Sequence, residues 1–265
     1  GFKSRTLVNL TGIKSLLAVS FCSIVFFISF LFPVLQMLYW TIIFPKHLAD
    51  LNIIKLFLNT IFLVFLSSIV LISFAFISNY GSRVSKSKFL EILNTFSISG
   101  YAIPGIILAV AFITFISWFD NNVISNFGIN TIKSVFIGSI LGLVFVYFIR
   151  FYSLASNGIK SGYLKINYSI DESAYLLGYS KFNTFKNIHI PYLKNSVLLI
   201  GILIAIEVIK ELPITLIMRP FNFETFATQA YIYASQDLLE AAAAPSLFLI
   251  LIASFFILIT SRYIL

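Results

Sequence analysis

Charge is scarce in this sequence, and so are the side chains that most often carry chemistry. Asp, Glu, Lys and Arg make up 11% of the 265 residues, whereas a soluble domain carries about 25%. The single cysteine, Cys22, excludes an internal disulfide, and with His47 and His189 it is too isolated for a soft-metal site. No G-x-x-x-x-G-K-[ST] run occurs, which excludes the usual loop that cradles ATP phosphates. We therefore predict no catalytic residues, no enzyme activity and no cofactor held by this chain, and leave metal binding through oxygen ligands open.

The chain has long uncharged runs instead. Lys14 and Lys46 are separated by 31 residues without a formal charge, and Lys55 and Arg83 by 27. Each run exceeds the roughly 20 residues that cross a bilayer core. The sequence therefore predicts an all-α polytopic membrane protein. Six spans are expected, at about 16–44, 56–77, 98–118, 131–151, 196–215 and 241–261.

Two of these spans carry local irregularities. Span four has only 16 uncharged residues between Lys133 and Arg150, so we expect both side chains to snorkel to the membrane interfaces. Its Gly138-x-x-x-Gly142 spacing is typical of close helix packing. In span three, Pro104-Gly105 predicts a bend that serves either as a static kink or as a hinge.

Lysine and arginine predict the orientation. An even number of spans puts both termini on one side, and that side, with the loops 78–97 and 150–195, holds thirteen of the 18 Lys and Arg residues. Positive side chains favour the cytoplasmic side. We therefore expect both termini and the 150–195 loop in the cytoplasm, and this orientation accounts for the net charge of +8 without a nucleic-acid partner.

A patterned polar insert, residues 171–191, lies between two apolar spans. The spacing from Ser169 to Glu172 is that of a capping box and predicts a helix start. Gly178 suits a left-handed turn after a helix end, and a second short helix is expected from Ser180. Two amphipathic helices joined by a sharp turn fit either an interfacial element on lipid headgroups or a docking element for a cytoplasmic partner.

The spacing of this insert resembles the EAA loop of ABC importer permeases, which reads E-A-A, three residues, G, nine residues, I-x-L-P. Here Ser173 replaces an alanine and Ile190 replaces the leucine. In that family the loop is a coupling helix seated in a groove of a separate ATPase, which binds ATP and Mg. The resemblance implies ATPase coupling by Glu172, Ser173, Ala174, Gly178, Ile188 and Pro191.

Three further stretches resemble the ferric-iron (Fe3+) importer permeases of bacterial inner membranes. YAIPGIILA (101–109) is similar to their Y-A-x-P-G-x-x-L-A, EVIKELPITL (207–216) to E-V-x-K-E-L-P-A-T-L, and RPFNFETFAT (219–228) to R-P-F-N-F-D-T-L-A-T. The resemblance implies the type I ABC importer permease fold and ferric iron as the cargo. Because thiamine, sulfate, phosphonate and polyamine permeases share the architecture, another small solute is the alternative, and an ion-coupled secondary transporter is a more distant one.

The same resemblance implies a domain organisation and partners. Such permeases are often one chain of two six-span halves, and the opening GFKSR resembles the basic linker before the second half. We expect a cytoplasmic basic linker at 1–15 and the permease domain at 16–265, with the coupling loop at about 167–191. The implied partners are cytoplasmic ATP-binding subunits, a second permease half or homodimer mate, an extracytoplasmic solute-binding protein and membrane lipid.

Span five forces charges into the membrane. Only 12 uncharged residues separate Lys194 from Glu207, so a crossing helix must include Glu207, Lys210 and Glu211. One ionised group near the bilayer centre costs about 2.5–3.5 kcal/mol on insertion scales, which disfavours exposure to lipid. These residues therefore form either a structural ion pair that fixes helix packing or the lining of a translocation path.

The outer loop 216–240 combines polar anchors with aromatic side chains, among them Arg219, Phe221 and Glu224. Aromatic residues at this position fit a membrane-interface belt. They fit equally a surface that receives the solute-binding protein, and for that reading Arg219, Phe221 and Glu224 are the candidate contacts.

Overall fold

The structure is a computed structural model, and it describes residues 10–85, 88–122 and 133–264. All regular elements in these ranges are helices. A membrane-crossing helix needs about 17–25 residues. In the described ranges, six helical stretches are long and apolar enough to cross: Ile13–Ile43, Ile53–Ser85, Gly105–Asn122, Ile140–Tyr163, Lys181–Lys210 and Leu239–Ser261. The predicted fold class is confirmed, and the protein is a multi-pass membrane protein; residues 1–9 of the expected linker lie outside the described residues.

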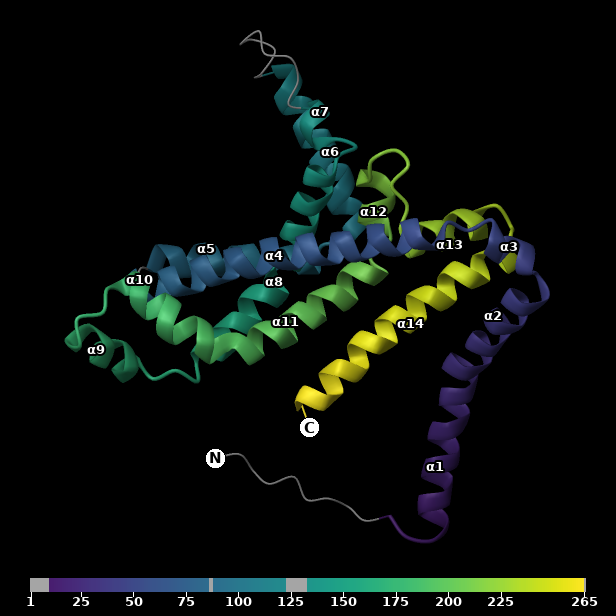
Figure 1. The fold of residues 1–265 in the computed structure, drawn as a ribbon, viewed down its shortest axis with the longest axis horizontal. Helices are drawn as coiled ribbons and strands as arrows, with labels where there is room; N and C mark the ends of the chain where they lie inside the picture. The colour runs from purple at the N-terminus through teal and green to yellow at the C-terminus, as the bar shows by residue number, and fades with distance from the viewer. Residues whose placement is uncertain (1–9, 86–87, 123–132, 265) are drawn as a thin grey trace.

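Figure 1 shows the arrangement of the helices. Their bounds, in chain order, are α1 (Ile13–Phe26), α2 (Phe32–Ile43), α3 (Pro45–Ala49), α4 (Ile53–Ser85), α5 (Lys88–Ile98), α6 (Gly105–Asn122), α7 (Lys133–Phe136), α8 (Ile140–Tyr163), α9 (Tyr168–Leu176), α10 (Lys181–Thr184), α11 (Ile190–Lys210), α12 (Pro213–Met218), α13 (Phe226–Ser235) and α14 (Leu239–Ile264). A π turn (Phe27–Leu31) joins α1 to α2, another (Phe185–His189) joins α10 to α11, and a 3₁₀ turn (Ser99–Ala102) follows α5.

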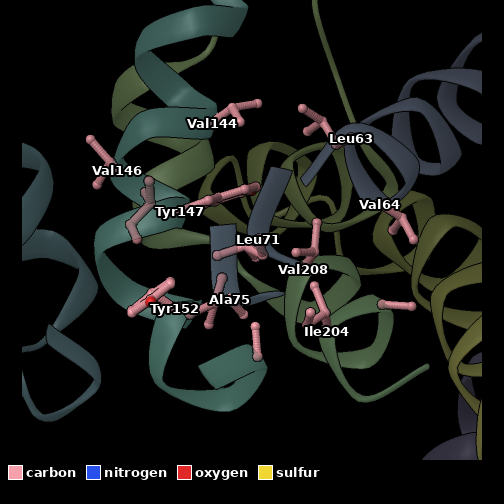
Figure 2. Close-up of a cluster of buried hydrophobic side chains, with 14 of the residues drawn as sticks. Leu63, Val64, Leu71, Ala75, Val144, Val146, Tyr147, Tyr152, Ile204 and Val208 are labelled. Carbon is pink, nitrogen blue, oxygen red and sulfur yellow. The ribbon is translucent and has the colours of Figure 1, made fainter. Parts of the chain in front are cut away.

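The core lies where α4, α8 and α11 pack against one another, and Figure 2 shows its buried side chains. Two glycines of α8 bring its backbone close to α11. A Cβ at Gly158 would lie 2.4 Å from Cγ1 of Ile200, and one at Gly162 would lie 2.6 Å from Cδ2 of Leu193. Because lipid is as apolar as the helix surfaces, membrane helices depend on such close van der Waals packing.

Span four differs from its prediction. The helix α8 covers 140–163 instead of 131–151, so Arg150 lies well inside it and not at its end. Gly138, with φ +68°, forms the turn before α8. A Cβ at Gly142 would lie 1.8 Å from the carbonyl oxygen of Phe136, so this glycine packs against the end of α7, the short helix that precedes α8. The prediction failed because it treated Arg150 as an end of the span, whereas a carboxylate inside the protein neutralises it.

The first span stands apart from the bundle in Figure 1. No residue of α1 is buried, whereas α2 lies against α14. Just before Pro33 the span has an irregularity, the π turn Phe27–Leu31. Proline lacks an N–H and its ring crowds the preceding turn of a helix, which is the reason for the wider turn there.

Candidate functional site

The polar insert folds into two short helices with a sharp turn between them. Asn167 is the N-cap of α9, and its side-chain oxygen accepts from the amide of Ser169 at 3.3 Å. The predicted capping box from Ser169 is therefore wrong by two positions, because asparagine and serine are both good N-caps and the sequence offers one of each. Gly178, with φ +83°, forms the turn between the two helices. The amide of Tyr179 donates to Ala174 O at 3.0 Å, as expected for a left-handed turn after a helix end.

The second arm of the elbow runs directly into a membrane helix. Ser180 caps α10 by accepting from the amide of Asn183 at 3.2 Å. Pro191 lies in the first turn of α11, directly after the π turn, and its missing N–H and its ring account for the wider turn before it, as at Pro33. The sequence predicts that Pro191 stops the helical pattern, but the path is helical from Lys181 to Lys210. The second arm of the elbow is therefore continuous with α11, without an intervening loop.

Three buried side chains, named here the anchor cluster, tie α9 to the bundle: Arg83, Asp171 and His189. Arg83 Nε donates to Asp171 Oδ2 at 2.7 Å, and His189 Nε2 lies 2.8 Å from Asp171 Oδ1. The side chains of these residues are 7%, 10% and 0% exposed, respectively. Asp171 on α9 is thus joined to the end of α4 and to the turn that begins α11.

Backbone carbonyls and aromatic rings complete the surroundings of Arg83. Its Nη2 donates to Ile166 O at 3.0 Å, and its guanidinium carbon lies 4.2 Å from the ring centroid of Tyr168. The hydroxyl of Tyr80, one turn earlier on α4, donates to Lys181 O at 2.5 Å. Arg83 and His189 were not identified from the sequence, because partners so distant along the chain leave no local pattern. In the structure, Asp171 is buried and the neighbouring Glu172 is exposed, so α9 has one face turned towards the protein.

The residues expected to couple to an ATPase divide between the two faces of the elbow. Glu172 and Ser173 are exposed, whereas Ala174 is buried against the body of the elbow. A shallow cleft of about 390 Å³ lies beside them, lined by Ser169, Ile170, Ser173, Ala174, Leu177, Tyr179, Asn187 and Ile188. The tip is apolar, with Leu176 and Leu177 exposed at 89% and 78%.

The charges of span five form two separate ion pairs. Lys210 Nζ lies 2.7 Å from Glu207 Oε1, one turn apart on α11. Glu211 has extended backbone just beyond the end of α11, and its Oε2 lies 3.4 Å from Arg150 Nε on α8. The side chain of Glu211 is 7% exposed, that of Glu207 is 21% and that of Lys210 is 55%. Sequence reasoning identified the acids but missed Arg150 as a partner.

The outer loop is held by its own polar residues. Arg219 pairs with Glu224, and its Nη1 donates to Phe223 O at 3.3 Å. The carbonyl of Glu224 accepts from Asn59 Nδ2 at 2.8 Å, which ties the loop to α4. Phe221 is 100% exposed. Among the candidate contacts, Arg219 and Glu224 thus support the loop, and Phe221 is the side chain that it presents.

No family model matches the sequence. The chain is 19% identical, over 253 residues, to the Fe(3+)-transport system permease protein FbpB 2 of Haemophilus influenzae, covering 94% of this chain and 47% of that protein. It therefore spans about half the length of the curated relative that it matches.

Solved structures match over nearly the whole chain. One is a bacterial alginate ABC transporter in complex with an alginate pentasaccharide-bound periplasmic protein, with a TM-score of 0.74, 16% identity and 92% of each chain covered. Another is a bacterial ABC transporter involved in the import of the acidic polysaccharide alginate, with a TM-score of 0.71, 17% identity and 94% coverage of each chain. The chain has an ABC importer permease fold.

This fold does not specify a cargo. The relative is named for ferric iron, and the structures are named for a polysaccharide. Within the described residues, no group of three or more His, Cys, Asp and Glu side chains is placed to hold a metal ion. The fold and the comparisons thus leave the cargo open.

Proposed function

We propose that this chain is the transmembrane permease subunit, or half, of a binding-protein-dependent ABC importer in a bacterial inner membrane. Its α9–α10 elbow faces the cytoplasm and docks on a separate ATPase, which binds and hydrolyses ATP with Mg. One observation carries the proposal: a short helix with an exposed apolar tip is fastened to two membrane helices through buried charges.

The exposed tip supports docking. Leu176 and Leu177 are among the most exposed large apolar side chains of the protein. Burying one leucine side chain contributes about 1.5–3 kcal/mol, so a partner groove that takes both gains a substantial part of a binding free energy. The exposed Glu172 on the same helix adds a charge that a basic groove would pair.

The buried anchor supports transmission of force. Asp171 is held by Arg83 of α4 and lies against His189 at the beginning of α11. Interactions between buried charged partners are lost at a high cost, so α9 moves with both helices and not independently. ATP-driven movement of the docking groove would then reach the membrane interior through α4 and α11.

The proposed cargo is ferric iron, moved inward. The motif resemblances at 101–109, 207–216 and 219–228 and the distant relative support it, and a hard cation prefers the oxygen ligands that Glu207 offers. An importer of another small solute is the alternative, because structures with this fold serve alginate. The second permease half or a mate, and an extracytoplasmic solute-binding protein at the outer loop, complete the proposed assembly.

The docking test uses the full transporter purified from its host through a tag on this chain. We expect an ATPase subunit to co-purify with the unaltered chain and to be lost from Leu176→Ser/Leu177→Ser. The matched control is Ile13→Ser, whose side chain is 76% exposed on α1, and it should retain the ATPase. Equal retention of the ATPase by the double variant would contradict docking through α9.

The cargo test follows uptake into proteoliposomes. Ferric iron is supplied as a nitrilotriacetate chelate or on its binding protein. Its uptake should require ATP and should continue when an ionophore removes ion gradients. Uptake of thiamine or sulfate but not iron would move the assignment to the alternative cargo. Uptake driven by a gradient without ATP would favour a secondary transporter.

A further inference from the structure

Two membrane segments lose their helical backbone at the same level of α8. Ile103, between the 3₁₀ turn Ser99–Ala102 and α6, has an extended ψ of 131°. Glu211, between α11 and α12, has ψ 108°. A Cβ at Gly100 would lie 2.1 Å from the carbonyl oxygen of Ile149, and Glu211 meets Arg150, the next residue of α8. Non-helical backbone at membrane depth is tolerated only where protein covers it or where it lines a water-filled cavity.

One guanidinium joins these two interruptions. Arg150 Nη1 donates to Ile103 O at 3.3 Å, and Nε lies 3.4 Å from Glu211 Oε2. The other carboxylate oxygen of Glu211, Oε1, accepts from the amide of Ile214 at 3.3 Å, which satisfies the first turn of α12. Arg150 thus links the carbonyl of Ile103, before α6, to Glu211, whose carboxylate caps α12.

The junction is closely packed. A Cβ at Gly105, the first residue of α6, would lie 2.6 Å from Arg150 Nη1 and 2.7 Å from Glu211 Oε1. Thr215 Oγ1 donates to Glu211 O at 2.5 Å, and the hydroxyl groups of Tyr147 and Thr215 are hydrogen-bonded. Glu211 is therefore held through both its side chain and its carbonyl, and its carboxylate is already occupied.

Glu207 is in a different situation one turn earlier. Its carboxylate is three times as exposed as that of Glu211, at 21% against 7%, and its partner Lys210 is 55% exposed. A lysine ammonium on a flexible stem makes a point-charge contact that another cation can replace, whereas the planar guanidinium of Arg150 is fixed by several partners. An incoming cation would therefore compete with Lys210 at Glu207.

We infer that Arg150 is a positioning residue that fixes the two interruptions and holds Glu211, so that Glu207 with Lys210 is the cation-exchange site of the membrane path. The inference rests on the proposed function and divides its candidate path residues into a fixed pair and an exchangeable pair. The class of cargo that it names is a hard cation or a cationic chelate, met by a single carboxylate and not by a coordination cage.

Accessibility tests this division without any knowledge of the cargo. Cys22 is the single cysteine of the sequence, so Cys22→Ser removes the only thiol of these 265 residues, and the same transporter without an added cysteine gives the background reactivity of the other subunits. In the Cys22→Ser transporter we expect Glu207→Cys to react with a positively charged methanethiosulfonate at least tenfold faster than Glu211→Cys. Adding Arg150→Met to Glu211→Cys should raise its rate towards that of Glu207→Cys. Equal rates at the two positions without Arg150→Met would overturn the inference.

Transport kinetics test the roles. With the free ferric ion as the probe, buffered by nitrilotriacetate, Glu207→Gln should raise KM about tenfold and leave the maximal rate within twofold. Arg150→Met should instead lower the maximal rate about tenfold with KM within twofold, and Arg150→Lys should recover part of that rate. The double variant Arg150→Met/Glu211→Met removes both buried charges, so it should recover thermal stability while staying slow.

The outcomes separate the inference from the proposed function. If the unaltered transporter takes up no ferric iron with ATP, the proposed ferric-iron cargo fails while the reactivity experiment still judges Arg150. If it transports, and Glu211→Gln raises KM as much as Glu207→Gln does, the division between the two pairs is wrong.

Discussion

Arg83 Nε and Asp171 Oδ2 lie 2.7 Å apart although 88 positions of sequence separate them. The contact joins the end of the longest helix, α4, to the short helix α9 outside the core. Because His189 lies against the other oxygen of the same carboxylate, one acid holds the elbow to two membrane helices. Under the proposed function, this is the shortest route from an ATPase groove to the core.

Breaking this contact should uncouple hydrolysis from transport. Asp171→Ala leaves Arg83 buried without a counter-charge, and removing one partner of a buried pair costs about 3–5 kcal/mol. We expect ATPase activity of the assembled transporter to persist while uptake falls at least tenfold. Asp50→Ala is the matched control, because it removes an exposed acid that lies outside the elbow; its uptake per ATP should stay unchanged. Normal uptake by Asp171→Ala would contradict the anchoring role.

The glycine elbow gives a second prediction. Gly178 has φ +83° and open space where a Cβ would stand, so Gly178→Ala carries only the left-handed backbone cost of about 1–2 kcal/mol. Gly178→Pro cannot adopt this φ at all, and we expect it to insert normally but lose ATP-coupled uptake. Gly81→Ala, also with open space but within helix α4, should be neutral or slightly stabilising. Coupled uptake at the normal rate by Gly178→Pro would show that the elbow is dispensable.

The junction at Gly105 predicts a packing defect. A methyl group there would press on Arg150 and Glu211, and overpacking of this kind costs about 1–3 kcal/mol. Thermal unfolding in detergent should show a lowered midpoint for Gly105→Ala. Gly201→Ala provides the comparison, since its nearest atom would be 3.7 Å away, and its midpoint should move little. Equal midpoints would mean that the junction relaxes freely.

In the outer loop, we expect one phenylalanine to affect binding of the solute-binding protein and another to affect the stability of the fold. Phe221 is 100% exposed and Phe226 is 1% exposed. Phe221→Ala should leave the unfolding midpoint unchanged and weaken the uptake that a loaded solute-binding protein stimulates. Phe226→Ala should instead destabilise by about 3–5 kcal/mol, as large buried aromatics do. Full stimulation of Phe221→Ala would remove Phe221 from the contact surface.

The parts of the fold that depend on neighbouring residues could be predicted from the sequence. Long uncharged runs gave the membrane helices, and Gly178 gave the turn, because both signals lie within a few residues of the structure that they cause. The start of α9 was misplaced by two positions because Asn167 and Ser169 are chemically equivalent as caps. Such small shifts depend on which cap the rest of the chain holds in place.

The contacts between distant segments could not be predicted. Arg150 limited the predicted fourth span because, on the sequence alone, a charge marks a membrane boundary. The structure neutralises it with Glu211, 61 positions later, and the helix then continues on both sides. The anchor cluster was missed for the same reason, since the pairing of Arg83 with Asp171 has no periodic or local signature.

The isolation of α1 gives the protein a built-in reporter. Cys22, the lone thiol of the sequence, lies on this helix and is exposed. Since no residue of α1 is buried against the described part of the chain, protection of that thiol from a lipid-soluble maleimide would indicate a neighbouring molecule. A fluorophore attached to Cys22 would report, in native membranes, when a neighbouring molecule binds beside α1 and when it leaves.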